Sequence, residues 1–169
     1  MHRLSIIYSW GVRLSTRVLP DVPPVMRFRG FLYSFMMKSC GSNFQVSSTS
    51  YINSLNGISV GDDVYFAHNV VVLGKEITIE NEVMIGPNTV VVSGNHSFLG
   101  NSFRFGKSIS QPIVIEEGSW ISANCSILSG AVLPCRSILA AGSVLNKAFS
   151  EEKSLYGGSP AKFIKRLKV

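Results

Sequence analysis

The chain has 169 residues, of which 46% are hydrophobic and 15% charged, and its net charge is +6. This composition is ample for the core of one domain with flanking segments, and it favours an intracellular enzyme over a secreted scaffold. The cysteines at positions 40, 125 and 135 are odd in number and lack metal-ligand spacing, which argues against disulfides and against bound zinc.

Residues 1–39 are predicted to form an N-terminal helical capping segment. Prolines at positions 20, 23 and 24 divide it into two helices, each with an apolar stripe at helical spacing. The stripes are Leu4, Ile7, Tyr8, Gly11 and Val18, and then Val25, Phe28, Leu32, Phe35 and Met36. Neither stretch reaches the roughly 18 uncharged apolar residues of a membrane span, and no small-residue cleavage site follows. The chain is therefore expected to be neither transmembrane nor exported.

From residue 40 onward, aliphatic residues recur every six positions. The clearest run is Ile115, Ile121, Ile127, Leu133, Leu139 and Leu145, with Ser119, Cys125, Ala131, Ser137 and Ser143 four places after the first five. Strands repeat every two residues and helices every 3.6, so this period indicates short straight segments joined at regular corners. Three segments close one coil of about eighteen residues. The sequence therefore predicts an all-β solenoid with the large aliphatic side chains inside.

The same register continues toward the N-terminus. Val60, Phe66 and Val72 belong to it, as do Ile79, Ile85 and Val91, and a weaker set opens at Cys40, Val46 and Ile52. About five coils are predicted, starting near residues 40, 60, 79, 115 and 133. The repeat domain thus spans 40–149, interrupted by one protruding loop at 97–114, and is followed by a tail at 150–169.

Units such as Ile85-Gly86-Pro87-Asn88-Thr89-Val90 resemble those of the hexapeptide-repeat left-handed β-helix acyltransferases over roughly residues 40–166. The resemblance implies a left-handed parallel β-helix, acetyl-CoA as acyl donor, and a homotrimer with active sites between subunits. The period alone is less specific for chemistry, because related solenoids serve as nucleotidyltransferase appendages and carbonic anhydrases. A carbonic anhydrase needs three convergent ligands, and the three histidines lie far apart in sequence, so no metal is expected.

The run Ser93-Gly94-Asn95-His96 ends a coil directly before the interruption. Galactoside, maltose and streptogramin O-acetyltransferases place their general base histidine there, so the resemblance implies that His96 deprotonates a sugar hydroxyl attacking the thioester. Asn95 is then a neighbouring acceptor contact, and the alternative for His96 is a merely polar loop residue. No carboxylate that would orient His96 is evident, and a backbone carbonyl is the other candidate for that role.

The acceptor pocket is expected to draw on two further segments. In the coil before the histidine, the acceptor-binding asparagine of the family corresponds to the stretch Phe66-Ala67-His68-Asn69, so either His68 or Asn69 takes that role. In the loop, aromatic residues offer apolar platforms for a sugar ring and Arg104 offers hydrogen bonds. These aromatics are Phe98, Phe103 and Phe105. An equal alternative is that they pack the loop on a neighbouring subunit.

The C-terminal runs 139–147 and 156–166 look like the closing signature of the family, which binds acetyl-CoA. Small residues let the pantetheine arm lie against the backbone, and basic residues suit the phosphates. Matched by position, the cofactor contacts are Trp120, Ala123, Ala141, Gly142, Ser143, Asn146, Lys147, Lys162 and Lys165. The tail is expected to end in a short C-terminal helix. The alternatives are a solvated basic helix end for the lysines and a surface aromatic for Trp120.

These features predict an acetyl-CoA-dependent sugar O-acetyltransferase acting in surface polysaccharide biosynthesis. The N-terminal segment resembles that of acetyltransferases from capsule, exopolysaccharide and lipopolysaccharide gene clusters. The alternatives are N-acetylation of a nucleotide-linked amino sugar and a catalytically silent solenoid that serves assembly. Nucleic acid binding is disfavoured, because the basic residues lack a recognisable motif.

Two interpretations of residues 1–39 remain. In the favoured interpretation, the helices cap the unpaired strand edges of the first coil. In the other interpretation, they rest on an anionic membrane surface. The expected location is cytoplasmic, and in the second case it is the inner face of the membrane, where a lipid-linked acceptor is found.

Overall fold

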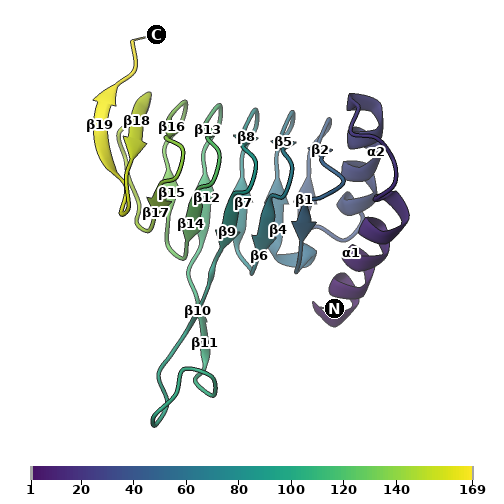
Figure 1. The fold of residues 1–169 in the computed structure, drawn as a ribbon, viewed down its shortest axis with the longest axis horizontal. Helices are drawn as coiled ribbons and strands as arrows, with labels where there is room; N and C mark the ends of the chain where they lie inside the picture. Colours follow the sequence, from purple (N-terminus) through teal and green to yellow (C-terminus); the bar gives the residue numbers. More distant parts are fainter. Residues whose placement is uncertain (1, 169) are drawn as a thin grey trace.

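The computed structural model describes residues 2–168 as a solenoid with two helices at one end and a long arm on one side (Figure 1). Three parallel sheets form the faces of a prism, in which each coil contributes one strand to each sheet. Sheet A contains β1 (Ser39–Cys40), β4 (Ile58–Val60), β7 (Ile77–Ile79), β12 (Ile113–Ile115) and β15 (Val132–Leu133). Sheet B contains β2 (Gln45–Val46), β5 (Tyr65–Phe66), β8 (Met84–Ile85), β13 (Trp120–Ile121), β16 (Ile138–Leu139) and β18 (Ser154–Gly157). Sheet C contains β3 (Tyr51–Ile52), β6 (Val71–Leu73), β9 (Val90–Val92), β14 (Ser126–Leu128) and β17 (Val144–Leu145).

The period of six is confirmed as the packing repeat. All six aliphatic residues from Ile115 to Leu145 are fully buried, and the small residues four places later are buried at the corners. Equivalent positions stack directly, since Ile121 pairs in register with Ile85 on one side and Leu139 on the other. Five coils are complete and β18 begins a sixth, so the solenoid has about six turns. Its core is therefore one continuous aliphatic column.

Replacement of one residue of this column should be costly. We expect Ile127→Ala, on β14 of sheet C, to lower the free energy of unfolding by about 2–5 kcal/mol, because the rigid stack collapses little around the cavity. The matched control is Ser126→Ala on the outer side of the same strand, with an expected change within about 0.5 kcal/mol. Chemical denaturation measures both, and equal effects would contradict the inward assignment.

The corners between sheets B and C form a row along one edge of the prism, here called the B–C corner row. It comprises residues 67–70, 86–89, 122–125 and 140–143. Each of these four corners has one residue in the left-handed region, namely Asn69, Asn88 and Asn124 at φ 58° and Gly142 at φ 70°, whereas the first B–C corner at 47–50 does not. Asparagine and glycine tolerate this backbone best. Neighbouring corners are linked by hydrogen bonds, as from the Gly142 amide to the Ala123 carbonyl at 2.9 Å.

The long interruption is an arm rather than a shapeless loop. β10 (Gly94–His96) and β11 (Ser108–Ser110) pair antiparallel and carry the chain far from the solenoid (Figure 1). The predicted span was 97–114, but pairing already begins at Gly94, and Ile113 is back in the core. Ser93 anchors the base, because its buried hydroxyl donates to the Lys75 carbonyl at 2.6 Å and accepts from the Lys75 amide at 2.9 Å. The arm leaves the prism at the edge between sheets C and A.

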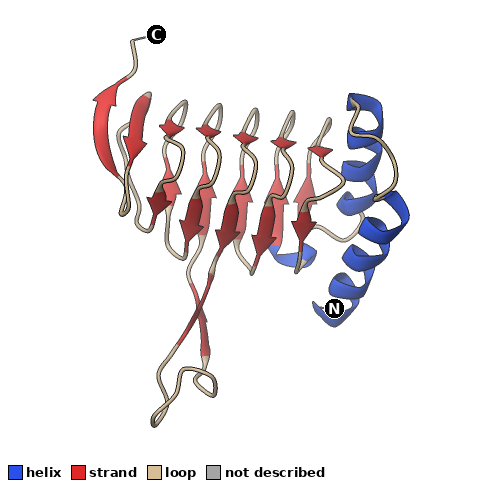
Figure 2. Ribbon diagram, viewed as in Figure 1, coloured by secondary structure: helices blue, strands red, loops and turns tan. Residues whose placement is uncertain are grey.

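The helices α1 (His2–Thr16) and α2 (Pro23–Ser34) pack on the first coil, as Figure 2 shows, with the short helix η1 (Leu55–Gly57) beneath α1. Both helices therefore pack against the end of the solenoid, as the capping interpretation predicts. The packed face of α1 is not the predicted stripe, because Leu4, Ile7 and Val18 are exposed. Its buried residues are Ser5, Ser9, Val12 and Thr16. The end of a solenoid presents backbone acceptors, and hydroxyl side chains satisfy them where aliphatic ones cannot: the Ser9 hydroxyl donates to the Ile52 carbonyl.

The prediction of a short C-terminal helix is wrong. Residues Lys162–Arg166 form the strand β19, antiparallel to β18, at the end of sheet B. Gly157 and Gly158 (φ 104°) turn the chain back on itself. Without the turn, β18 would leave an open sheet edge, and a five-residue segment is too short to form a stable helix alone. β19 therefore closes the sheet at the end opposite to the helices.

Candidate active site

A groove of about 320 Å³ lies on the outer face of sheet B, across β5, β8 and β13. Its lining is mainly apolar and comprises Tyr65, Ala67, His68, Met84, Ile85, Gly86, Pro87 and Trp120. Trp120 and Met84 are register partners on neighbouring strands, and both side chains are nearly half exposed. The structure thus brings together His68 and Trp120, which the sequence proposed separately. An indole, a thioether and an imidazole around one groove suit a small ligand with both an apolar face and hydroxyl groups.

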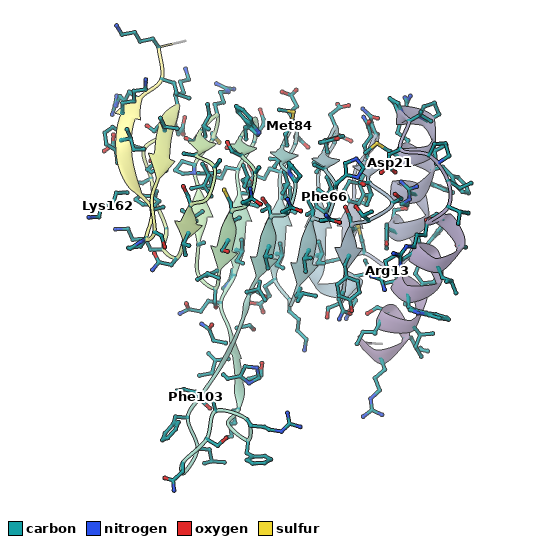
Figure 3. The ribbon with its side chains drawn as sticks, in the orientation of Figure 1. Arg13, Asp21, Phe66, Met84, Phe103 and Lys162 are labelled. Carbon is teal, nitrogen blue, oxygen red and sulfur yellow. The ribbon has the colours of Figure 1, made fainter. Side chains whose placement is uncertain are left out.

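His68 is held at the rim of this groove by a polar network. Its Nδ1 atom lies 2.9 Å from the Ser47 hydroxyl and 3.4 Å from Asp21 Oδ2. Asp21 comes from the connection between α1 and α2, and its position at the junction of helices and solenoid is seen in Figure 3. The helical segment therefore contributes directly to the surroundings of the groove. Asn69, the other candidate for this position, donates to the Asn88 side chain at 3.0 Å and so belongs to the corner row.

Asp21 was missed by the sequence analysis, although it is the one acidic residue among positions 1–39. Its carboxylate accepts hydrogen bonds from the Ser48 amide at 2.8 Å and the Ser47 hydroxyl at 2.6 Å, and pairs with Arg29 at 3.0 Å. Burial acts to raise the pKa of Asp21, but these hydrogen bonds and the Arg29 charge outweigh it and hold the pKa below its usual value. The carboxylate therefore stays ionised beside His68.

The proposed pantetheine contacts lie on the B–C corner row, a few coils beyond His68. Ala141 and Gly142 are exposed, and a side chain built on Gly142 would meet nothing within 4 Å. Ala123 lies one coil before them, and its carbonyl accepts a hydrogen bond from the Gly142 amide. Ser143 differs, because it is buried and its hydroxyl accepts from the Gly158 amide at 3.0 Å. Open corners with exposed backbone next to a groove leave room for an extended ligand to lie along the edge.

The predicted cofactor contacts that have basic or amide side chains lie in two separate regions. Asn146 and Lys147 follow β17 at the edge from which the arm projects, and the Lys147 ammonium lies 5.1 Å from the centre of the Phe149 ring. Lys162 and Lys165 lie exposed on β19 at the far end of sheet B. Both groups are accessible to a phosphate, but they lie on different edges of one chain.

His96 lies exposed on β10, with Ser108 opposite it in the hairpin. Within the described residues 2–168, no side chain or carbonyl forms a hydrogen bond with its ring. Farther along the arm, the Phe98 and Phe103 rings pack at 5.0 Å, and Arg104 is exposed with Asn95. Figure 3 shows Phe103 on the arm and Met84 of the groove on opposite sides of the solenoid. One chain therefore does not bring His96 to the groove or to the corner row.

The predicted catalytic and cofactor-binding residues are thus distributed over two edges of the prism. The arm carries the accessible imidazole of His96, and the opposite side carries an apolar groove beside an open row of corners. Among residues 2–168, no group of three or more His, Cys, Asp or Glu side chains is arranged to hold a metal ion. The chemistry that these residues themselves support is proton removal from a bound hydroxyl or amine next to an extended donor.

Comparisons with known proteins place the chain among acetyltransferases, although no family model matches it. A hexapeptide-repeat acetyltransferase of Vibrio cholerae in complex with acetyl coenzyme A superposes with a TM-score of 0.84, covering 99% of this chain and 89% of that chain, at 28% identity. A galactoside acetyltransferase in complex with coenzyme A shares the fold, with a TM-score of 0.85 over 98% of this chain and 82% of that one, at 22% identity. The galactoside O-acetyltransferase of Escherichia coli is 26% identical over 74% of this chain.

Over nearly its whole length, the chain is similar in fold and sequence to hexapeptide-repeat acetyltransferases. Among the curated relatives, galactoside O-acetyltransferases of L. lactis and E. coli match it at 24% and 26% identity. Relatives of this family bind acetyl-CoA or CoA in their structures, and the left-handed coil sense follows from the family. The matched stretch spans 62% of the E. coli galactoside O-acetyltransferase and 60% of the Lactococcus lactis enzyme.

Proposed function

We propose that this chain transfers an acetyl group from acetyl-CoA to a hydroxyl of a sugar. The observation that carries the proposal is the accessible imidazole of His96 at the base of an arm, in a family whose structures hold the acetyl donor. The named relatives acetylate galactosides and maltose, and the groove beside Trp120 has the size and apolar floor of a site for one sugar ring.

The neutral His96 ring takes the proton of the acceptor hydroxyl as its oxygen attacks the thioester carbonyl. The C–O bond forms, the tetrahedral intermediate collapses, and the C–S bond breaks. The departing thiolate of CoA then recovers the proton from the imidazolium. Backbone amides of the corner at Ala123 are proposed to stabilise the intermediate's oxyanion. No covalent enzyme intermediate is needed.

The active form is proposed to be a homotrimer, because base and groove lie on opposite sides of one chain. A cyclic arrangement of three prisms places the arm of one chain against the B–C corner row of the next. His96, Asn95, Phe98 and Arg104 then face His68, Trp120 and Ala141 of a neighbour. The exposed aromatics of the arm support this arrangement, since a lone chain leaves Phe98, Phe103 and Phe105 more than half exposed.

The acceptor class is tested by a panel of sugars. Release of CoA from acetyl-CoA, followed with a thiol reagent, is expected with galactosides, maltose and related hydroxy-sugars. Turnover with amino sugars alone, and an amide product by mass spectrometry, would establish the N-acetyltransferase alternative instead. No transfer to either class by a protein that binds acetyl-CoA would favour the assembly role.

The proposed cellular role is O-acetylation of a surface polysaccharide unit in the cytoplasm. Its support is the N-terminal helical segment, which resembles that of acetyltransferases from polysaccharide gene clusters. Loss of the gene should remove O-acetyl groups from the purified polymer, as seen by proton NMR, and return of the wild-type gene should restore them. An unchanged acetyl content would contradict this role.

We expect Lys165→Ala to raise the KM for acetyl-CoA about three- to tenfold with little change in kcat, because one exposed ammonium contributes modestly to holding a phosphate. The matched control is Lys168→Ala, which removes the same charge just beyond β19. Initial rates at varied acetyl-CoA measure both variants. A larger effect at low ionic strength is part of the expectation. Equal KM values for the two variants would remove Lys165 from the cofactor site.

A further inference from the structure

The outward side of α1 is apolar, although its packed side is polar. Leu4, Ile7, Trp10 and Leu14 are each 56–64% exposed. On a helix they form one stripe opposite the buried Ser5, Ser9, Val12 and Thr16. Most surface helices have the reverse arrangement, with the apolar stripe toward the core. The outward stripe of α1 is therefore largely left out of the packing on the solenoid, although Ile7 and Trp10 line a shallow pocket with Tyr51.

The second helix repeats this arrangement. Phe28, Phe31 and Phe35 are 50–64% exposed, and the last two rings pack edge to face at 4.8 Å. They lie opposite the buried Met26, Arg29 and Tyr33 of the same helix. Trp10 and three phenylalanines are thus exposed on the two short helices, which lie at one end of the molecule (Figure 2). Aromatic side chains of this kind favour the interface between water and lipid.

The charges around these stripes are of one sign. Arg3, Arg17, Arg27 and Lys38 are exposed, and Arg13 lies 4.9 Å from the centre of the Tyr51 ring. Asp21 is the only acidic residue of positions 1–39, and it is enclosed with Arg29, Ser47 and Ser48. The outer surface of the two helices is therefore apolar and cationic, whereas residues 40–146 contain more acidic than basic side chains.

We propose that the outward faces of α1 and α2 bind an anionic lipid bilayer surface. The apolar stripes enter the boundary of headgroups and acyl chains, and the flanking arginines meet the lipid phosphates. The charge pattern favours this occupant over a second copy of the same face, because two such faces would oppose arginine to arginine. Neither helix, nor any other helix in residues 2–168, is long and apolar enough to cross a membrane. The contact is therefore peripheral, with the helices lying flat.

The position of the helices suits this role. They cover the end of the solenoid, so a surface bound there leaves the groove of sheet B and the arm free. In the proposed cyclic trimer, all three helical ends lie on the same side, and three weak contacts combine into one stronger one. This avidity argument depends on the trimer, but the lipid-binding surface itself is present in each chain.

The proposal is tested by flotation of the full chain with vesicles of phosphatidylcholine, with and without phosphatidylglycerol. Binding is expected to be more than about tenfold stronger to the anionic vesicles and to weaken with added salt. Ile7→Glu combined with Leu14→Glu should reduce binding at least about tenfold, since two charges enter the apolar stripe. The control, Ile164→Glu on β19, alters an equally exposed apolar residue at the opposite end and should bind as wild type. In a Trp120→Phe background, emission from Trp10 should shift to the blue only with anionic vesicles.

Acetyl-CoA binding by the double variant serves as the test of folding, independent of any acceptor. Absence of wild-type binding to anionic vesicles, or equal binding by the wild type and the double variant, would overturn the proposal. A third result would also overturn it: the wild type does not bind lipid, and the double variant has a lower oligomeric mass than the wild type in light scattering. The stripes would then be an interface between copies of the chain.

Discussion

Replacement of His96 by alanine should lower kcat for acetyl transfer by about 10²–10⁴-fold, the usual contribution of a positioned general base. Acetyl-CoA should still bind with nearly wild-type affinity, because the proposed cofactor contacts lie on other elements of the chain. Steady-state rates and calorimetric titration with acetyl-CoA measure the two quantities separately. The arm is paired through its backbone, so the substitution should leave the fold unchanged.

Two variants serve as controls for this result. Ser108→Ala removes the hydroxyl of the residue paired with His96 and should retain most activity. His68→Ala should mainly raise the KM for the acceptor, since His68 lies at the groove rim. If His68→Ala abolished kcat while His96→Ala remained active, the base would have to be assigned to His68, which has a carboxylate beside it.

The second large effect is expected at the junction of helices and solenoid. Asp21→Asn should lower the free energy of unfolding by about 3–5 kcal/mol, because the buried Arg29 guanidinium loses its partner charge. For a chain of this size, such a loss lowers Tm by roughly 10 °C. Asp63→Asn makes the same change at an exposed corner and should alter stability by less than about 0.5 kcal/mol. Thermal unfolding followed by circular dichroism compares the two.

The pH dependence of this effect has a definite sign. Hydrogen bonds and Arg29 lower the pKa of folded Asp21, so its stabilisation is fully present above the unfolded value of about 3.9 and is lost as pH falls through the lower folded value. The stability difference between wild type and Asp21→Asn should therefore be largest near neutral pH and shrink below about pH 4. A difference that grew on acidification would contradict the ionised state of Asp21.

The solenoid could be predicted because one residue per segment determines it. Aliphatic side chains such as Ile115 and Ile121 must point inward at every sixth position, and no helix or ordinary sheet repeats in that way. The corner residues follow from the same geometry, as at Asn88 and Gly142. The place where the chain leaves the prism was also visible, because the aliphatic repeat stops there.

The remaining features depend on contacts between distant segments. Asp21 looked like a lone acid in a basic stretch, and its role emerges only where α2 places Arg29 against the strand ends of the first coil. The outward stripe of α1 was misjudged because the capped end presents a backbone acceptor, the Ile52 carbonyl, to which Ser9 donates while Leu4 stays exposed. The tail was expected to be helical, but pairing with β18 decides the conformation of Lys162–Arg166. The hydrophobic periodicity of a single segment does not predict any of these contacts.

The central claim is that one active site is built from the arm of one chain and the B–C corner row of its neighbour. It is tested by mixing two inactive variants, His96→Ala and Ala141→Trp, under conditions that exchange subunits. Shared sites predict recovery to about a quarter of wild-type activity, because random mixing leaves roughly one interface in four with both surfaces intact. A mixture that remains as inactive as its components, with mixed oligomers verified by native mass spectrometry, would contradict the claim.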